Sequence, residues 1–296
     1  MSVEVNSENL KALNLSIQTT FRETKDNVKN ADMYKEFAEV VPSTTKVHGV
    51  LTLTDAPGMR EFTDERIPGT ISDVLYQVTH RKWESTLNVK REDIEDDNIG
   101  YIPAAVRKMT TKSKKHYTRL ATAALDGGFT AKMSDGKAFF HTDRNNILGT
   151  TSAKKTLDAT NFQAAIDLIE TATGLDGEPL GLKATKLIVG PKQRAAAKAI
   201  LNKETLANGE SNEHYKELEL FVDPYLGSSL NWFVLAGEEG NMPIVILERI
   251  KADKIVAKND LNSDRAFDTD VFAWGLRGRY DAGYSDPALL VGVLGQ

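Results

Sequence analysis

The sequence predicts an α+β protein of about two domains, and three observations carry this prediction. The first is the length of 296 residues, which exceeds an average single domain. The second is a long helix over residues 103–126, because Pro103 suits its first turn and Gly127 and Gly128 suit its end. The third is a last quarter in which β-branched and aromatic runs alternate with turn residues, as is typical of strands.

The composition excludes several classes of protein. Hydrophobic residues make up 41% and charged residues 27%, which is ordinary for a globular chain and argues against disorder. The net charge of -5 gives no support for general nucleic-acid binding. There is no cysteine, which rules out disulfides, thiolate metal sites and cysteine nucleophiles. We see no secretory signal and no membrane-spanning run, and therefore expect a soluble protein in the cytoplasm at synthesis.

The first 45 residues contain one short amphipathic helix. Its apolar residues recur at helical spacing behind Ser7, a candidate N-cap: Leu10, Leu13, Ile17 and Phe21. Such a stripe suits an arm that docks on a neighbouring subunit, with Leu13, Ile17 and Phe21 as candidate contacts. A helix that packs on its own domain remains the alternative.

Residues 47–89 alternate between strand-like runs and turn residues. Between the runs lies a long excursion whose charged residues are Arg60, Glu61, Asp64, Glu65 and Arg66. A loop of this length inside a compact domain is uncommon without a function, and we expect it to contact an adjacent subunit. The predicted helix that follows carries the basic series Lys108, Lys112, Lys114, Lys115 and Arg119. We interpret that series as a solvated or intersubunit face, because companions for base or phosphate contact are missing.

The second half begins near residue 157 and mixes helices with short strands. Helices are expected at about 164–174 and 193–201, a polar loop at 204–214, and strands at 186–191, 218–222, 232–236, 244–247 and from 271 onward. The runs around 221 and 232 read as two strands joined by a turn. A βαβ unit in the middle section remains open, although no glycine-rich dinucleotide motif accompanies it.

No group of residues forms a convincing chemical site. The acidic run at 92–98 suits capping or solvation better than cation binding. The stretch from Asp260 to Asp268 lacks the glycine and glutamate of an EF-hand and is rejected as a calcium site. His141 and Asp143 have no nucleophile elbow beside them. The histidines are scattered without helical pairing, so we expect no catalytic, cofactor-binding or metal-ligating residue.

Several segments, in order, resemble the Mu-like family of phage major head subunits, which adopt the Hong Kong 97 capsid fold. Residues 89–100 (VKREDIEDDNIG) are similar to the family's segment that enters its spine helix. Residues 125–130 (LDGGFT) and 135–141 (DGKAFFH) are similar to the elements after that helix. Residues 272–275 (FAWG) and 279–283 (RYDAG) are similar to the family's C-terminal strand. The resemblance covers most of residues 40–296, and residues 150–161 depart from it.

The resemblance implies a division of the chain into four parts. These are an N-terminal arm (1–45), a peripheral domain (46–156) with an extended loop (about 56–81) and a spine helix (about 103–126), an axial domain (157–245), and strands that return to the peripheral domain (246–296).

The function implied by the resemblance is that of a major capsid protein. It would assemble as pentamers and hexamers into an icosahedral head shell around double-stranded phage DNA, without sequence specificity and without enzymatic activity. Portal, scaffold and decoration proteins would be partners, and the protein would reside in the host cytoplasm before joining the virion. The alternatives are an encapsulin-like or gene-transfer-particle shell and, more remotely, a cytosolic hydrolase that pairs two carboxylates among Glu84, Asp93 and Glu95.

Overall fold

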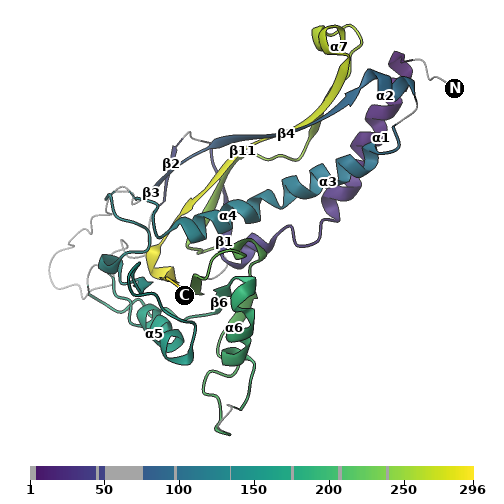
Figure 1. Cartoon of the computed structure of the whole chain (residues 1–296). Coiled ribbons are helices and arrows are strands. Elements are labelled where there is room, and N and C mark those ends of the chain that lie inside the picture. Colours follow the sequence, from purple (N-terminus) through teal and green to yellow (C-terminus); the bar gives the residue numbers. More distant parts are fainter. Residues whose placement is uncertain are drawn as a thin grey trace.

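The protein consists of an elongated first sheet that carries the long helices and a second sheet near the C-terminus (Figure 1). The computed structural model describes residues 5–44, 47–50, 76–96, 99–133, 135–174, 177–205, 209–237 and 240–296. The charged excursion with Arg60, Glu61, Asp64, Glu65 and Arg66 therefore lies outside the described residues. Next to the first sheet, β2 (Val47–Val50) and β3 (Tyr76–Thr79) form a separate antiparallel pair.

The first sheet is organised around β11 (Val271–Tyr284). This strand pairs antiparallel with β4 (Arg81–Lys90), β9 (Ile244–Ile250) and β10 (Ile255–Lys258) at different points along its length, and β1 (Ala38–Pro42) extends the sheet parallel to β9. Phe272, Trp274 and Leu276 alternate toward one face and are buried, whereas Arg277 is exposed. At the far end lie α2 (Arg91–Glu95) and α7 (Asp264–Thr269) (Figure 1).

The N-terminal helix α1 (Ser7–Asp26) packs within its own chain. Its predicted cap is wrong by one residue, because Asn6 and not Ser7 accepts from the first free amides. Its apolar stripe is buried in a cluster with α3 (Ile102–Lys114) and the first sheet. In the described chain, α1 therefore packs on the spine helix of its own subunit. This was the alternative to docking on a neighbouring subunit.

The spine helix is interrupted, where the sequence predicted one helix over residues 103–126. α3 ends at Lys114, Lys115 adopts a ψ of -5°, and α4 (His116–Gly127) continues the same course (Figure 1). The physical reason lies in the preceding turn, where Thr110 and Thr111 donate side-chain hydrogen bonds of 2.8 Å to the carbonyls four residues earlier. Such bonds compete with the backbone ladder and bend helices. The helix ends at the glycine pair, as predicted.

The second sheet has the order β5-β12-β8-β6-β7. Its strands are β5 (Ile147–Leu148), β6 (Lys186–Val189), β7 (Glu219–Val222), β8 (Trp232–Leu235) and β12 (Leu290–Val293). β6, α6 (Arg194–Leu201) and β7 form a βαβ unit, since β6 and β7 are parallel. β7 and β8 are joined through a turn but are not neighbours, because β6 lies between them. α5 (Ala159–Glu170) ends four residues before the predicted Gly174.

Sheet membership differs from the predicted domain boundaries at three places. β1 belongs to the first sheet although it falls within the predicted arm, and β5 joins the second sheet although it precedes residue 157. β10 and β11 lie in the first sheet, whereas β12 leaves it for the second. The reason is that strand pairing joins segments distant in sequence, which a linear division cannot represent.

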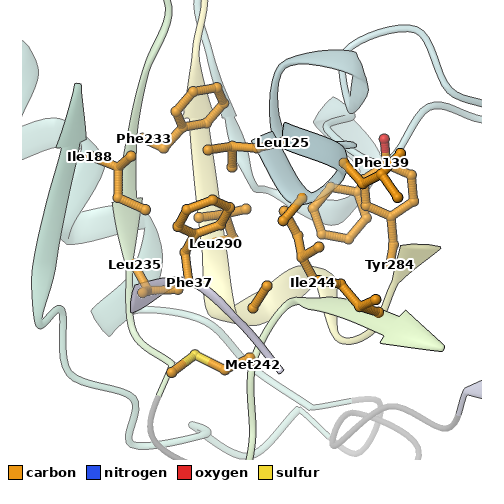
Figure 2. Packing of buried hydrophobic residues seen from close by; sticks show 14 of the residues in the cluster. Phe37, Leu125, Phe139, Ile188, Phe233, Leu235, Met242, Ile244, Tyr284 and Leu290 are labelled. Atoms are coloured by element: carbon orange, nitrogen blue, oxygen red, sulfur yellow. The ribbon is translucent and has the colours of Figure 1, made fainter. Parts of the chain in front are cut away.

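One apolar core spans the junction of the two sheets (Figure 2). It takes Phe233 from the second sheet, Ile244 from the first and Leu125 from α4. Phe139 stacks on Tyr284 with ring centroids 4.5 Å apart. The backbone of Gly128 approaches the ring of Phe140 so closely that a Cβ there would lie 2.7 Å from it. The two sheets are therefore held together by a common core. The described residues also form short 3-10 turns at Met33–Glu36, Thr142–Arg144, Pro191–Gln193, Pro224–Leu226 and Pro287–Leu289.

Candidate functional site

A cleft lies beside the interruption of the spine helix. Apolar residues of α3 pack into the cluster around α1, and those of α4 pack into the common core. Between them the helix is polar, from Thr110 to His116, and does not close against the sheet. The result is a cavity of about 520 Å³ between the helix and strands β4 and β11. That volume lies within the range of ligand-binding pockets, roughly 300–1,000 Å³.

Aromatic side chains form one wall of the cleft. Trp83 donates its indole N–H to the carbonyl of Tyr280 at 2.8 Å, and its ring meets the ring of His116 edge-on at 4.5 Å. The His116 Nδ1 lies 3.1 Å from the Tyr280 hydroxyl. Burial lowers the pKa of His116 below 6.5, and the nearby charges of Arg119 and Arg81 lower it further. The imidazole is therefore neutral at pH 7.

Behind this wall lies a buried polar contact. Tyr117 stacks on Tyr280 at 4.5 Å and donates its hydroxyl to the carboxylate of Glu248. Burial, together with that hydrogen bond, raises the pKa of the Tyr117 phenol, so it stays protonated. The wall is further fixed by Arg81, which pairs with Asp281 through two hydrogen bonds of 2.6 and 2.8 Å. These contacts hold the side chains of the aromatic wall in place through hydrogen bonds and ring stacking.

Basic side chains line the opposite side of the cleft. Lys112, Lys115 and Arg119 come from the spine helix, and Glu84 is the acidic residue of the lining. None of these three cations forms an ion pair with a residue that the structure describes. The cleft thus combines an aromatic wall with uncompensated positive charge.

The carboxylates of the hydrolase alternative do not come together. Glu84 lies on β4 and accepts a hydrogen bond from Thr86. Asp93 and Glu95 lie on α2, where Asp93 accepts from Tyr101 and Glu95 pairs with Arg91. Residues 92–95 of the acidic run thus lie in a short helix of their own, with acids in its first turn, and the N-cap position of the spine helix is Tyr101. Among the described residues, no group of three or more histidine or acidic side chains could hold a metal ion.

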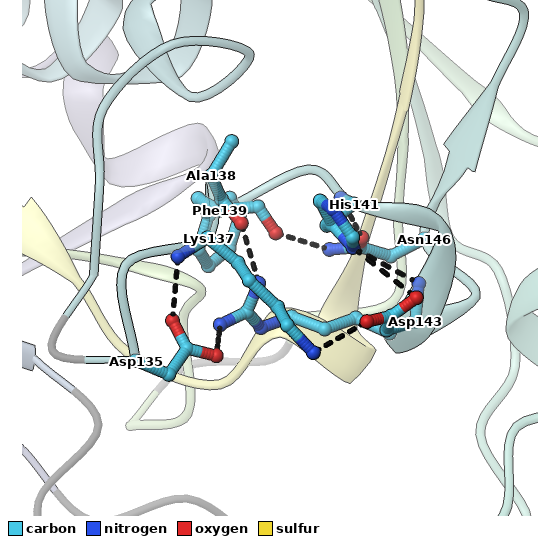
Figure 3. Close-up of polar contacts among 8 residues, drawn as sticks. Asp135, Lys137, Ala138, Phe139, His141, Asp143 and Asn146 are labelled. Atoms are coloured by element: carbon cyan, nitrogen blue, oxygen red, sulfur yellow. Dashed lines mark hydrogen bonds and ion pairs between the residues drawn. The ribbon is translucent and has the colours of Figure 1, made fainter.

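His141 and Asp143 belong to a network that ties down the loop after the spine helix (Figure 3). The Nδ1 of His141 accepts the amide of Asp143 at 3.1 Å, and Asp143 pairs with Lys137. Asn146 accepts the amide of His141 and donates to the carbonyl of Phe139. Each polar atom named here has a partner within the loop, so these residues stabilise the conformation of the loop.

The stretch from Asp260 to Asp268 is a capped turn and helix. The carboxylate of Asp260 accepts the amide of Asn262, and the hydroxyl of Ser263 accepts the amide of Ala266 at the start of α7. Ser263 is thus the N-cap of α7, and Asp260 stabilises the turn before it.

The predicted intersubunit residues divide into two groups. The charged group at 60–66 falls outside the described residues. Leu13, Ile17 and Phe21 are covered by their own chain, so a contact with a neighbouring copy through them would require the arm to be exchanged between copies. That contact stays a prediction. The aromatic wall was not predicted from the sequence, because its residues Trp83, His116 and Tyr280 are separated by up to 197 residues.

Comparison with known proteins places this architecture in a family. The chain matches the family described as Mu-like prophage major head subunit gpT over residues 10–154, 147–226 and 227–293. It belongs to that family. Within the family it is 25% identical over 261 residues to the Mu-like prophage FluMu major head subunit of Haemophilus influenzae, covering 88% of this chain and 66% of that protein. It is 28% identical over 155 residues to the major capsid protein of Escherichia phage Mu, covering 51% of this chain and 50% of that protein.

Solved structures confirm the predicted fold class. The procapsid of bacteriophage JBD30 matches with a TM-score of 0.58 and 23% identity, over 99% of this chain and 77% of that chain. A virus-like particle from Pyrococcus furiosus matches with a TM-score of 0.52 and 10% identity, over 94% and 98% of the two chains. The fold is thus the Hong Kong 97-type capsid fold that the resemblance implied. No described helix has both the length and the apolar character needed to cross a bilayer.

Proposed function

We propose that this protein is a major capsid protein that assembles with copies of itself into the head shell of a phage or prophage. The observation that carries the proposal is the family match along residues 10–293, combined with the capsid fold of the described chain. This chain spans 66% and 50% of the length of the two curated relatives, so the function of a whole protein of that kind is proposed here by similarity.

The finer parts of the proposal follow from the resemblance. Pentamers and hexamers would form the shell, scaffold, portal and decoration proteins would join it, and double-stranded DNA would fill it. Assembly would take place in the host cytoplasm. The protein would act without catalysis, a view supported by the structural nature of the family.

An encapsulin-like or gene-transfer-particle shell is the second candidate. It is favoured by the similarity of fold to the virus-like particle from Pyrococcus furiosus, because fold by itself does not separate these kinds of shell. The contents of purified particles would distinguish an encapsulin from the other two, since a phage shell or gene-transfer particle holds DNA and an encapsulin holds a protein cargo.

The test of the proposal is whether the purified chain assembles. Size-exclusion chromatography followed by electron microscopy should show capsomers or closed shells. A chain that stays monomeric at all concentrations, with no particles after co-expression with neighbouring head genes, would contradict it.

A second experiment tests the charged excursion at residues 56–81. Deletion of residues 58–68 should leave a folded subunit that fails to close shells, because Arg60, Glu61, Asp64, Glu65 and Arg66 would lose their partners on an adjacent copy. Each exposed pair contributes only about 0–1 kcal/mol, so the effect depends on repetition over the shell. Normal particles from the deletion variant would refute the contact.

A further inference from the structure

The spine helix carries more positive charge around its interruption than the chain neutralises. Arg107, Lys115 and Arg119 follow one another at intervals of eight and four residues, which places them on one side of the helix. With Lys112, they form no ion pair within the part of the chain that the structure describes. The whole chain has a net charge of -5, so this local excess runs against its overall balance.

Hollows lie on both sides of this basic stretch. The cleft described above lies between the helix and the sheet, and a second hollow of about 440 Å³ lies between the helix and the end of α1. Thr111 and Lys115 line both. The second hollow adds Lys29 and Arg107 and contains one acidic residue, Glu23. An anionic partner can therefore contact the helix from either side.

Besides its basic residues, the cleft also has an apolar part. Its sheet side presents the partly exposed ring of Trp83, whereas Leu276 and Tyr280 line the cleft with only 3% and 2% of their surface exposed. The guanidinium of Arg81 lies over the Trp83 ring, 5.0 Å from its centroid. A partner that fills this space needs an apolar or aromatic side chain of its own.

We propose that the cleft binds an acidic segment of a partner protein, with one aromatic or aliphatic side chain seated against Trp83 and with carboxylates paired to Lys112, Lys115 and Arg119. The basic residues favour carboxylates by charge complementarity, and the aromatic wall favours the aromatic or aliphatic side chain. Duplex DNA meets only the first requirement, because its backbone presents phosphates and no apolar group that enters a cleft. The inference goes beyond the proposed function, since it concerns a binding site of the subunit and holds whether or not the chain closes shells.

The test measures fluorescence anisotropy of three labelled probes with the full chain. The probes are a random copolymer of glutamate and tyrosine, polyglutamate, and a duplex DNA, all of matched charge. We expect the copolymer to bind more tightly than polyglutamate and more tightly than DNA, because the other two probes meet only the charge requirement. Tighter binding of DNA than of the copolymer would overturn the proposal in favour of a phosphate-binding surface.

Two variants and a control separate the two parts of the site. Replacing Lys112, Lys115 and Arg119 together by glutamine should weaken copolymer binding about tenfold, as three exposed pairs would. Ser113→Phe, which fills the cleft from the helix without changing charge, should weaken the copolymer and leave polyglutamate unchanged. Lys258→Gln on β10, an exposed lysine outside the cleft, should change neither.

Other outcomes would also refute the proposal. Unchanged binding in both cleft variants, with unchanged thermal melting, would show that the copolymer binds elsewhere. Oligomers of the parent chain without any probe, lost in the glutamine variant and kept in Lys258→Gln, would assign the cleft to a second copy.

Discussion

Replacing Ile17 by alanine tests whether α1 belongs to its own subunit. The Ile17 side chain is 1% exposed, in a cluster with Val106 of α3 and Trp274 of β11. The same helix carries a matched control, because Leu15 is 67% exposed. The two positions therefore differ in burial and share a helix.

The expected magnitude follows from the atoms removed. Isoleucine loses three carbons, each worth about 0.8 kcal/mol of transfer free energy, which gives roughly 2.4 kcal/mol. The cavity left behind adds to this, so the free energy of unfolding should fall by about 3 kcal/mol. With an unfolding entropy of about 2.1 cal/mol/K per residue over 296 residues, the melting temperature should fall by about 5 °C.

The assay is thermal and urea unfolding of subunits kept below the concentration at which they assemble. Leu15→Ala should change stability by no more than about 0.5 kcal/mol, as expected of a surface site. Equal melting temperatures for Ile17→Ala and Leu15→Ala would refute intrachain docking. If Ile17→Ala then reduced particle yield alone, the stripe would contact a neighbouring subunit.

Three further predictions concern the junction around α4. Gly128→Ala should lower the free energy of unfolding in urea by about 1–3 kcal/mol, because the new Cβ would overlap the packed ring of Phe140. Gly127→Ala should be nearly neutral, because its Cβ would meet only one atom, at 3.7 Å. Equal urea midpoints for the two variants would contradict the close packing of Gly128 on Phe140. Thr122→Val should lower the urea stability by about 1–3 kcal/mol, since it removes a hydrogen bond from the fully buried carboxylate of Asp223, and an unchanged midpoint would count against this. Burial holds the pKa of His116 below its unfolded value of 6.5, so the unfolded chain takes up the proton first as the pH falls and stability declines below about pH 6.5. His116→Asn should reduce that decline in melting temperature, and an identical pH profile would refute the assignment.

Much of the fold was predictable because the spacing of apolar residues and the positions of glycine and proline indicate where helices and strands begin and end. The spacing of Leu10, Leu13, Ile17 and Phe21 predicted a helix with these residues on its buried side, and the structure has both. Gly127 and Gly128 marked the end of α4, because glycine is common at the end of a helix. The interruption at Lys115 was not predicted. It depends on threonine hydroxyls that donate to carbonyls of the same helix, and such bonds do not change the spacing of apolar residues.

Residue patterns by themselves determined the α+β class and the positions of most strands along the chain. The order of the motifs pointed to the capsid family. Tertiary structure decided which sheet each strand joins, as with β12, and where the polar middle of the spine helix would leave a cleft. It also brought Trp83, His116 and Tyr280 into contact. The physical reason is that periodicity reports which face of an element is apolar, whereas the identity of the surface that covers that face depends on pairing between segments far apart in the chain.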